Sequence, residues 1–196
     1  LNFKPSTPFP KIKGLVSKLR TYQQLGAEWI SFLYENGFGG LLCDDMGLGK
    51  THEVMAFMLY LRKHRKIKKP FLVVCPTTVL SHWSEKIRDH APGLKAVVYH
   101  GGLRDLDHAL VSGDVLLTSY GILRRDIRVL RKRPFGLLVE EFPQLVSWIV
   151  NAGRIHENDL GIVCGQDAKL TATRGLGFWG HRRHFLSEQR VDQRRF

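Results

Sequence analysis

Cysteine is scarce in this sequence, and the three present, Cys43, Cys75 and Cys164, are odd in number and far apart. This pattern argues against a disulfide framework and favours a reducing compartment. Long apolar runs are also missing: none approaches the roughly 20 residues that a membrane span needs. The first residues contain no continuous apolar stretch that would indicate a signal peptide. We therefore expect an intracellular protein without a membrane partner, cytoplasmic in a prokaryote or nuclear in a eukaryote.

Acidic residues are few, and the net charge is +12. Residues 1–139 hold 22 Lys/Arg against 11 Asp/Glu, whereas residues 140–196 hold 8 against 7. The excess is densest at 62–69 and 124–133. A basic domain favours polyanions such as nucleic acid, and solvated cations at helix ends are the alternative explanation.

Apolar spacing predicts an α/β domain. After a proline-rich, extended lead-in over 1–18, apolar residues at three- and four-residue spacings predict a helix over 19–36. Further helices are expected at 49–64, 78–91, 104–112 and 121–133, and strands at 41–43, 71–75, 95–100, 114–120 and 135–140. This alternation predicts a doubly wound parallel sheet with helices on both faces.

The stretch LLCDDMGLGKTHEV, residues 41–54, has the order strand, glycine-rich turn, helix start. Backbone N–H groups and the helix dipole at such a turn hold phosphates, a lysine reaches the outer phosphates, and a hydroxyl binds magnesium. The pattern predicts ATP and Mg²⁺ as cofactors. The strict motif has glycine six residues before the lysine, where this chain has Asp44.

DDMGLGKT resembles motif I of the Swi/Snf-type DNA translocases, the helicase-like superfamily-two motors of chromatin remodelling. Four more segments resemble the family in the same order: LRTYQQLGAEWI (19–30), VVCPTTVLSHW (73–83), VVYHG (97–101) and DVLLTSYGILRRD (114–126). The resemblance is close over 19–139. It implies the N-terminal RecA-like ATPase lobe of a two-lobed motor that acts on duplex DNA without regard to sequence. The first residue is not Met, so we expect a piece of a longer protein whose second lobe follows in the same chain.

The resemblance also implies roles for individual residues. The residues expected to bind nucleotide are Gln23 (at the adenine), Asp44, Met46, Gly47, Leu48, Gly49, Lys50 and Thr51, of which Lys50 also acts in catalysis and Thr51 binds Mg²⁺. The residues expected near the DNA backbone are Pro76, Thr77, Thr78, Thr118 and Ser119. Turn-forming hydroxyls are the alternative explanation for Thr118 and Ser119.

The family's next motif is Asp-Glu directly after an apolar strand; its Asp orders magnesium and its Glu polarises the attacking water. Here the strand FGLLV runs into Glu140 and Glu141. We predict Glu140 as the magnesium ligand and both as catalytic residues. The extra methylene of Glu140 moves its carboxylate by about 1 Å, an error that costs up to 10²-fold in rate. A solvated strand end is the alternative.

Beyond Glu141 the resemblance weakens. We expect a helix from Gln144, a strand over 160–165, a partial motif in LTAT (170–173) and an irregular tail over 176–196. The predicted lobe is therefore 19–175. Divergence, degeneration of a paralogue and a frameshift near residue 140 are three hypotheses for the change. Two other functions remain open: the lobe of a different superfamily-two helicase, or a non-catalytic, nucleotide-gated DNA-binding module.

Overall fold

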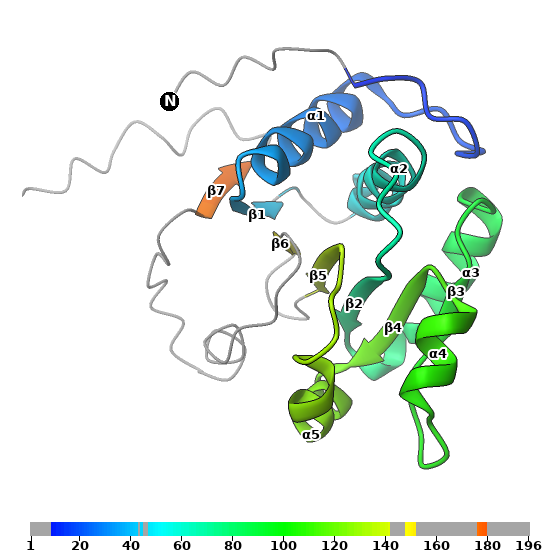
Figure 1. Cartoon of the computed structure of the whole chain (residues 1–196). Helices are drawn as coiled ribbons and strands as arrows, with labels where there is room; N and C mark the ends of the chain where they lie inside the picture. The colour runs from blue at the N-terminus through cyan, green and yellow to red at the C-terminus, as the bar shows by residue number, and fades with distance from the viewer. Residues whose placement is uncertain (1–8, 43, 45–46, 142–147, 152–175, 180–196) are drawn as a thin grey trace, which may run out of the picture.

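A seven-stranded sheet organises the chain (Figure 1). The computed structural model describes residues 9–42, 44, 47–141, 148–151 and 176–179. The strands are β1 (Gly39–Leu42), β2 (Phe71–Cys75), β3 (Ala96–Val98), β4 (Val115–Ser119), β5 (Leu137–Glu141), β6 (Trp148–Asn151) and β7 (Leu176–Trp179), in the spatial order β3-β4-β2-β5-β6-β1-β7. Neighbours pair in parallel except at β6, which is antiparallel to both β5 and β1.

Helices lie on both faces of this sheet, as the sequence predicts. They are α1 (Thr21–Glu35), α2 (Lys50–Lys63), α3 (Leu80–His90), α4 (Leu106–Ser112) and α5 (Tyr120–Leu130), with a short 3₁₀ helix, η1 (Thr77–Val79), before α3. Successive residues of β2 point to opposite faces: Val73 joins a core cluster with α1, α2 and α3, whereas Leu72 and Val74 join one with α5. Strands β2 and β4 and most of β5 are thus buried on both faces, which explains their continuous apolar runs, whereas β3 is only partly covered.

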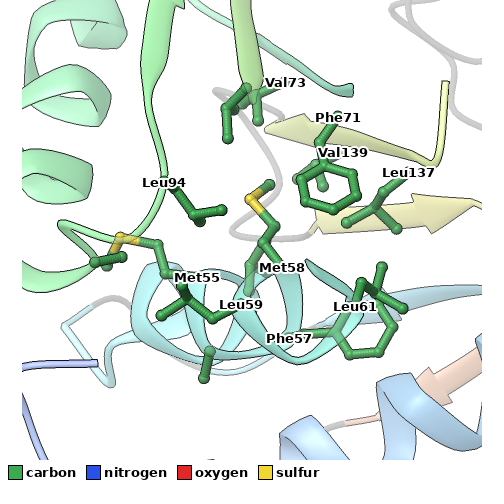
Figure 2. Close-up of a cluster of buried hydrophobic side chains, with 14 of the residues drawn as sticks. Met55, Phe57, Met58, Leu59, Leu61, Phe71, Val73, Leu94, Leu137 and Val139 are labelled. Atoms are coloured by element: carbon green, nitrogen blue, oxygen red, sulfur yellow. The ribbon is translucent and has the colours of Figure 1, made fainter. Parts of the chain in front are cut away.

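Helix α2 is the central packing element of the first cluster. Its side chains Met55, Met58 and Leu59 are fully buried and meet those of β2 and β5, including Val73 and Val139 (Figure 2). Because α2 packs on the sheet through this apolar face, Gly49 and Lys50 at its start are held against the sheet.

The lead-in packs onto the lobe. Its described part, residues 9–18, has no helix or strand, as expected. Phe9 is nevertheless buried against Tyr60, and its backbone N–H donates to Glu28 Oε1 at 2.9 Å. The N–H of Val16 donates to the carbonyl of His90 at 2.9 Å. These contacts attach the segment to α1 and α3.

Two predictions beyond Glu141 are wrong. The helix expected from Gln144 is contradicted, because residues 148–151 form β6, which lies between β5 and β1. The tail is not irregular throughout, because residues 176–179 form β7 beside β1. Periodicity does not separate strand from helix in apolar runs as short as these, so sheet pairing decides. The strand expected at 160–165 and the partial motif at 170–173 lie outside the described residues.

Candidate functional site

The predicted site residues follow the strand ends along one edge of the sheet. Strands β1, β2, β4 and β5 run in the same direction, so their carboxyl ends share that edge, where open α/β sheets bind ligands. Across the sheet, Glu141 pairs with Trp148, which in turn pairs with Leu42. The acidic pair is therefore level with the start of the glycine-rich turn, two strand spacings or about 10 Å away.

The turn before α2 has the backbone that a phosphate loop requires. Gly47 and Gly49 have φ angles of +84° and +83°, in the left-handed region that residues with a Cβ rarely adopt. A Cβ on Gly49 would lie 2.4 Å from Gln23 Nε2, whereas one on Gly47 would meet nothing within 4 Å. The turn is packed on the side of α1 and open at Gly47. Met46 lies outside the described residues.

Lys50 is the first residue of α2 and is buried, with 6% of its surface exposed. Its Nζ donates to the backbone carbonyl of Asp44 at 2.6 Å. Lys50 therefore holds the two ends of the turn together and also places a cation inside it. Asp44, which stands where the strict motif has glycine, contributes its carbonyl oxygen to this contact.

Gln23 connects the predicted adenine segment with the turn. Its Nε2 donates to the carbonyl of Leu48 at 3.0 Å, and the hydroxyl of Tyr22 donates to the same oxygen at 2.9 Å. The backbone N–H of Arg20 donates to Gln23 Oε1 at 2.9 Å. The structure thus brings Gln23, Leu48 and Gly49 together; that Gln23 reads adenine stays a prediction.

Glu53 is a buried acid that sequence reasoning missed. It lies on the inner side of α2 and is fully buried, with its carboxyl group against Gly26 of α1. The pKa of Glu53 is raised to about 9, mainly by burial and also by the charge of Asp44, while Lys50 opposes the shift. At neutral pH the Glu53 side chain is therefore uncharged. The sequence feature that indicates this burial is an acid followed directly by the apolar residues Val54 and Met55 in a helix.

Glu53→Gln is expected to stabilise the fold at alkaline pH. The ordinary pKa of 4.5 applies to the unfolded chain, which therefore loses this proton at a lower pH than the folded chain does. The free energy of unfolding consequently falls as pH rises from about 4.5 to about 9. We expect the variant to be close to the parent near pH 5 and to exceed it by up to about 5 kcal/mol at pH 8. Urea unfolding at both pH values measures this. Glu85→Gln, which alters an exposed acid on α3, is the control, and equal changes in the two variants would contradict the assignment.

Glu140 and Glu141 point to opposite faces at the end of β5. Glu140 is buried, whereas Glu141 is half-buried and makes two contacts. Its Oε2 accepts a hydrogen bond from Trp83 Nε1 at 2.7 Å, and its carbonyl oxygen accepts one from the hydroxyl of Tyr120 at 2.8 Å. Strand β6 lies between this pair and β1. The metal and catalytic roles of the two carboxylates stay predictions.

Trp83 is a core residue of α3 that also makes a polar contact. It is 2% exposed, so its indole N–H needs a partner, and that partner is Glu141. Burial raises the pKa of the nearby Tyr120 hydroxyl, and the charge of Glu140 raises it further. Burial, with the charge of Glu141, likewise raises the pKa of the Cys75 thiol to about 12, so Cys75 is an inert core residue.

The predicted DNA contacts differ in their exposure. Thr77 and Thr78 are exposed and Pro76 is half-buried at the end of β2. Thr118 is fully buried, and its hydroxyl donates to the carbonyl of Tyr99 at 2.9 Å. Ser119 is buried and caps α5 by accepting from the N–H of Ile122. The side chains of Thr118 and Ser119 therefore have structural partners, and their proximity to DNA stays a prediction.

The two basic clusters lie at different places. Residues 62–69 run from the last turn of α2 to just before β2, at the edge opposite the phosphate turn. The cluster at 124–133 begins one turn after Ser119, with Arg124, Arg125 and Arg128 exposed on α5. Only the cluster at 124–133 begins near the edge where the parallel strands end and where the predicted DNA contacts lie.

Within the part of the chain that the structure describes, no three His, Cys, Asp or Glu side chains gather closely enough to hold a metal ion. Binding through the Thr51 hydroxyl and nucleotide phosphates fits this arrangement, since Mg²⁺ commonly takes few protein ligands. The described helices include none with the length and apolar character of a membrane span.

Comparison with known proteins gives a consistent result. The model of the SNF2-related domain matches residues 22–141. The chain is 37% identical over 146 residues to the TATA-binding protein-associated factor MOT1 of Saccharomyces cerevisiae, covering 67% of this chain and 8% of MOT1. It is 39% identical over 121 residues to the ISWI chromatin-remodeling complex ATPase CHR17 of Arabidopsis thaliana, covering 59% of this chain and 11% of CHR17.

A solved structure shares the fold. The SWI2/SNF2 ATPase core of Sulfolobus solfataricus in complex with dsDNA matches with a TM-score of 0.54 and 36% identity, covering 65% of this chain and 26% of that one. The RecA-like fold predicted from the sequence is confirmed by this match and by the parallel strands described above. The chain spans about a tenth of the length of the two curated relatives described.

Proposed function

This chain belongs to the SNF2-related domain family, and on that premise we propose that it is the ATP-binding first lobe of a Swi/Snf-type, duplex-DNA-dependent ATPase and translocase. The observation that supports the proposal most is the turn at 47–51, where two left-handed glycines precede a buried lysine at a helix start. A second RecA-like lobe in the same protein completes the motor in this proposal.

The phosphate loop works through groups of this chain. The first N–H groups of α2 and its dipole face the phosphates. Lys50 exchanges the Asp44 carbonyl for phosphate oxygens, an exchange that favours the ligand because bonds between two charged groups are the stronger ones. Gln23 and Tyr22 fix Leu48, so the base and phosphate ends of the site are held together. Magnesium, when bound with ATP, supplies neutralisation of phosphate charge.

Duplex DNA is the proposed macromolecular partner, bound through its backbone. Thr77 and Thr78 are exposed hydroxyls at a strand end, suited to sequence-independent phosphate contact. The arginines of α5 add positive charge near the same edge, and the partner in the Sulfolobus structure is dsDNA.

DNA affinity is expected to fall steeply with salt and to be indifferent to sequence. Each phosphate neutralised by Lys or Arg contributes about −0.9 to the slope of log K against log salt. Replacing Arg124, Arg125 and Arg128 by Gln should reduce that slope by roughly 2–3. Fluorescence anisotropy with two unrelated duplexes measures it. Lys66→Gln/Lys68→Gln/Lys69→Gln, which removes the same charge at the opposite edge, is the matched control. A slope near zero, or equal losses in both triple variants, would contradict this assignment.

A non-catalytic module is the second candidate function. Glu140 in place of the family's Asp favours it, and so does the engagement of Glu141 Oε2 by Trp83. ATP hydrolysis by the full-length protein with duplex DNA separates the two: a motor turns over, whereas a module only binds. Strand separation by the same protein would instead indicate a different superfamily-two helicase.

A further inference from the structure

Two hydrogen bonds connect Glu141 with helices that begin beside the predicted DNA contacts. Thr77 lies in η1, which continues into α3, and Trp83 of α3 donates from Nε1 to Glu141 Oε2 at 2.7 Å. Ser119 is followed by Tyr120, the first residue of α5, whose hydroxyl donates to the Glu141 carbonyl at 2.8 Å. Each of the two segments expected near DNA is thus followed by a residue that donates a hydrogen bond to Glu141.

The two donors approach Glu141 from opposite faces of the sheet. Trp83 belongs to the core cluster that contains α2, whereas α5 packs in the cluster on the other face. Trp83 is 2% exposed, so its indole is confined by its neighbours. The bond to Glu141 therefore changes when α3 shifts, and a shift of about 1 Å takes a 2.7 Å contact beyond hydrogen-bonding distance.

We propose that Trp83 is a positioning residue that couples contact with duplex DNA at the strand ends to the release of the Glu141 carboxylate, while Tyr120 holds the Glu141 backbone in place. The inference rests on the proposed function and adds how DNA regulates the site. Without DNA, Oε2 is engaged by the indole. Phosphates bound at the exposed hydroxyls of η1 displace α3, which continues from it, and the freed oxygen accepts a hydrogen bond from water.

The strength of the hydrogen bond between Trp83 and Glu141 determines how strongly DNA can stimulate hydrolysis. The 2.7 Å distance is that of a hydrogen bond to a charged acceptor, and such a bond shifts an equilibrium by about 10- to 100-fold. The carboxylate would then be released in about 1–10% of molecules without DNA. DNA stimulation of the same order follows from this step alone.

The indole N–H of Trp83 reports the bond directly in ¹H–¹⁵N NMR spectra of this chain. The chain has four tryptophans, and Trp83→Phe assigns the resonance. Glu141→Gln is expected to move it upfield, because a neutral amide is a weaker acceptor than a carboxylate. A saturating short duplex should move it in the same direction, while the indole of Trp29 on α1 serves as the internal control.

The outcomes separate this inference from the proposed function. A duplex that fails to bind, by anisotropy, overturns both. A duplex that binds without moving the Trp83 resonance, or that moves Trp29 equally, overturns only the coupling.

A second measurement uses the full-length protein. Trp83→Phe should raise DNA-independent ATP hydrolysis about tenfold and lower the stimulation ratio by the same factor. A purely structural role would lower hydrolysis with and without DNA alike, and that result would overturn the coupling.

Discussion

Lys50→Met is expected to reduce the affinity for ATP by about 100-fold or more. The substitution removes the cation inside the phosphate turn but keeps an unbranched stem in its buried position. Loss of charge-assisted bonds to phosphate corresponds to about 3 kcal/mol, and 1.4 kcal/mol is a factor of ten in affinity. Isothermal titration calorimetry with Mg·ATP measures the change.

The control must separate lost phosphate binding from a loosened turn, because Lys50 also donates to the carbonyl of Asp44. Urea unfolding reports the structural contribution, and Lys86→Met, on the exposed side of α3, is the matched surface variant. Lys86→Met should bind ATP like the parent. Unchanged ATP affinity in a folded Lys50→Met protein would contradict the phosphate-turn assignment.

Glu141→Gln is expected to abolish DNA-stimulated ATP hydrolysis in the full-length protein, by at least about 10²-fold, while ATP affinity stays the same. An amide fills the same space and still accepts from Trp83, but it cannot polarise water. Steady-state phosphate release with saturating duplex measures the rate.

Two variants show whether ATP hydrolysis depends on the acidic pair and not on any acidic side chain of the lobe. Glu85→Gln on α3 should hydrolyse ATP at the parent rate. Glu140→Asp, which restores the family's residue, should leave the rate unchanged or raise it. A Glu141→Gln protein with the parent rate would place the catalytic carboxylate elsewhere.

The helices and strands between Thr21 and Glu141 could largely be predicted from local patterns. The apolar run at 71–75 is too short for a helix and lies between two predicted helices, so a strand is expected there. The structure has strand β2 over these residues. The turn at 47–49 needs left-handed residues, and glycine stands at both positions that adopt them. Periodicity, turn chemistry and capping agree there, so the fold follows from them.

Contacts between distant segments could not be predicted in the same way. The burial of Glu53 against Gly26 depends on how closely α1 and α2 approach, and the bond from Trp83 to Glu141 joins residues 58 positions apart. Strand β6 was missed because a four-residue apolar run has no distinguishing period, and its antiparallel place between β5 and β1 comes from pairing alone. Thr118 illustrates a further limit: a hydroxyl at a strand end looks available in sequence, yet here it bonds to Tyr99.

The central claim is that the turn between β1 and α2 binds the phosphates of ATP. An NMR titration of the ¹⁵N-labelled chain with Mg·ATP tests it most directly, because the backbone amides of Gly47, Gly49 and Thr51 report on the turn itself. Saturable shifts centred on these three amides are expected in the parent, and these shifts should be lost in Lys50→Met. ATP binding that shifts amides elsewhere and leaves these three unmoved would contradict the central claim.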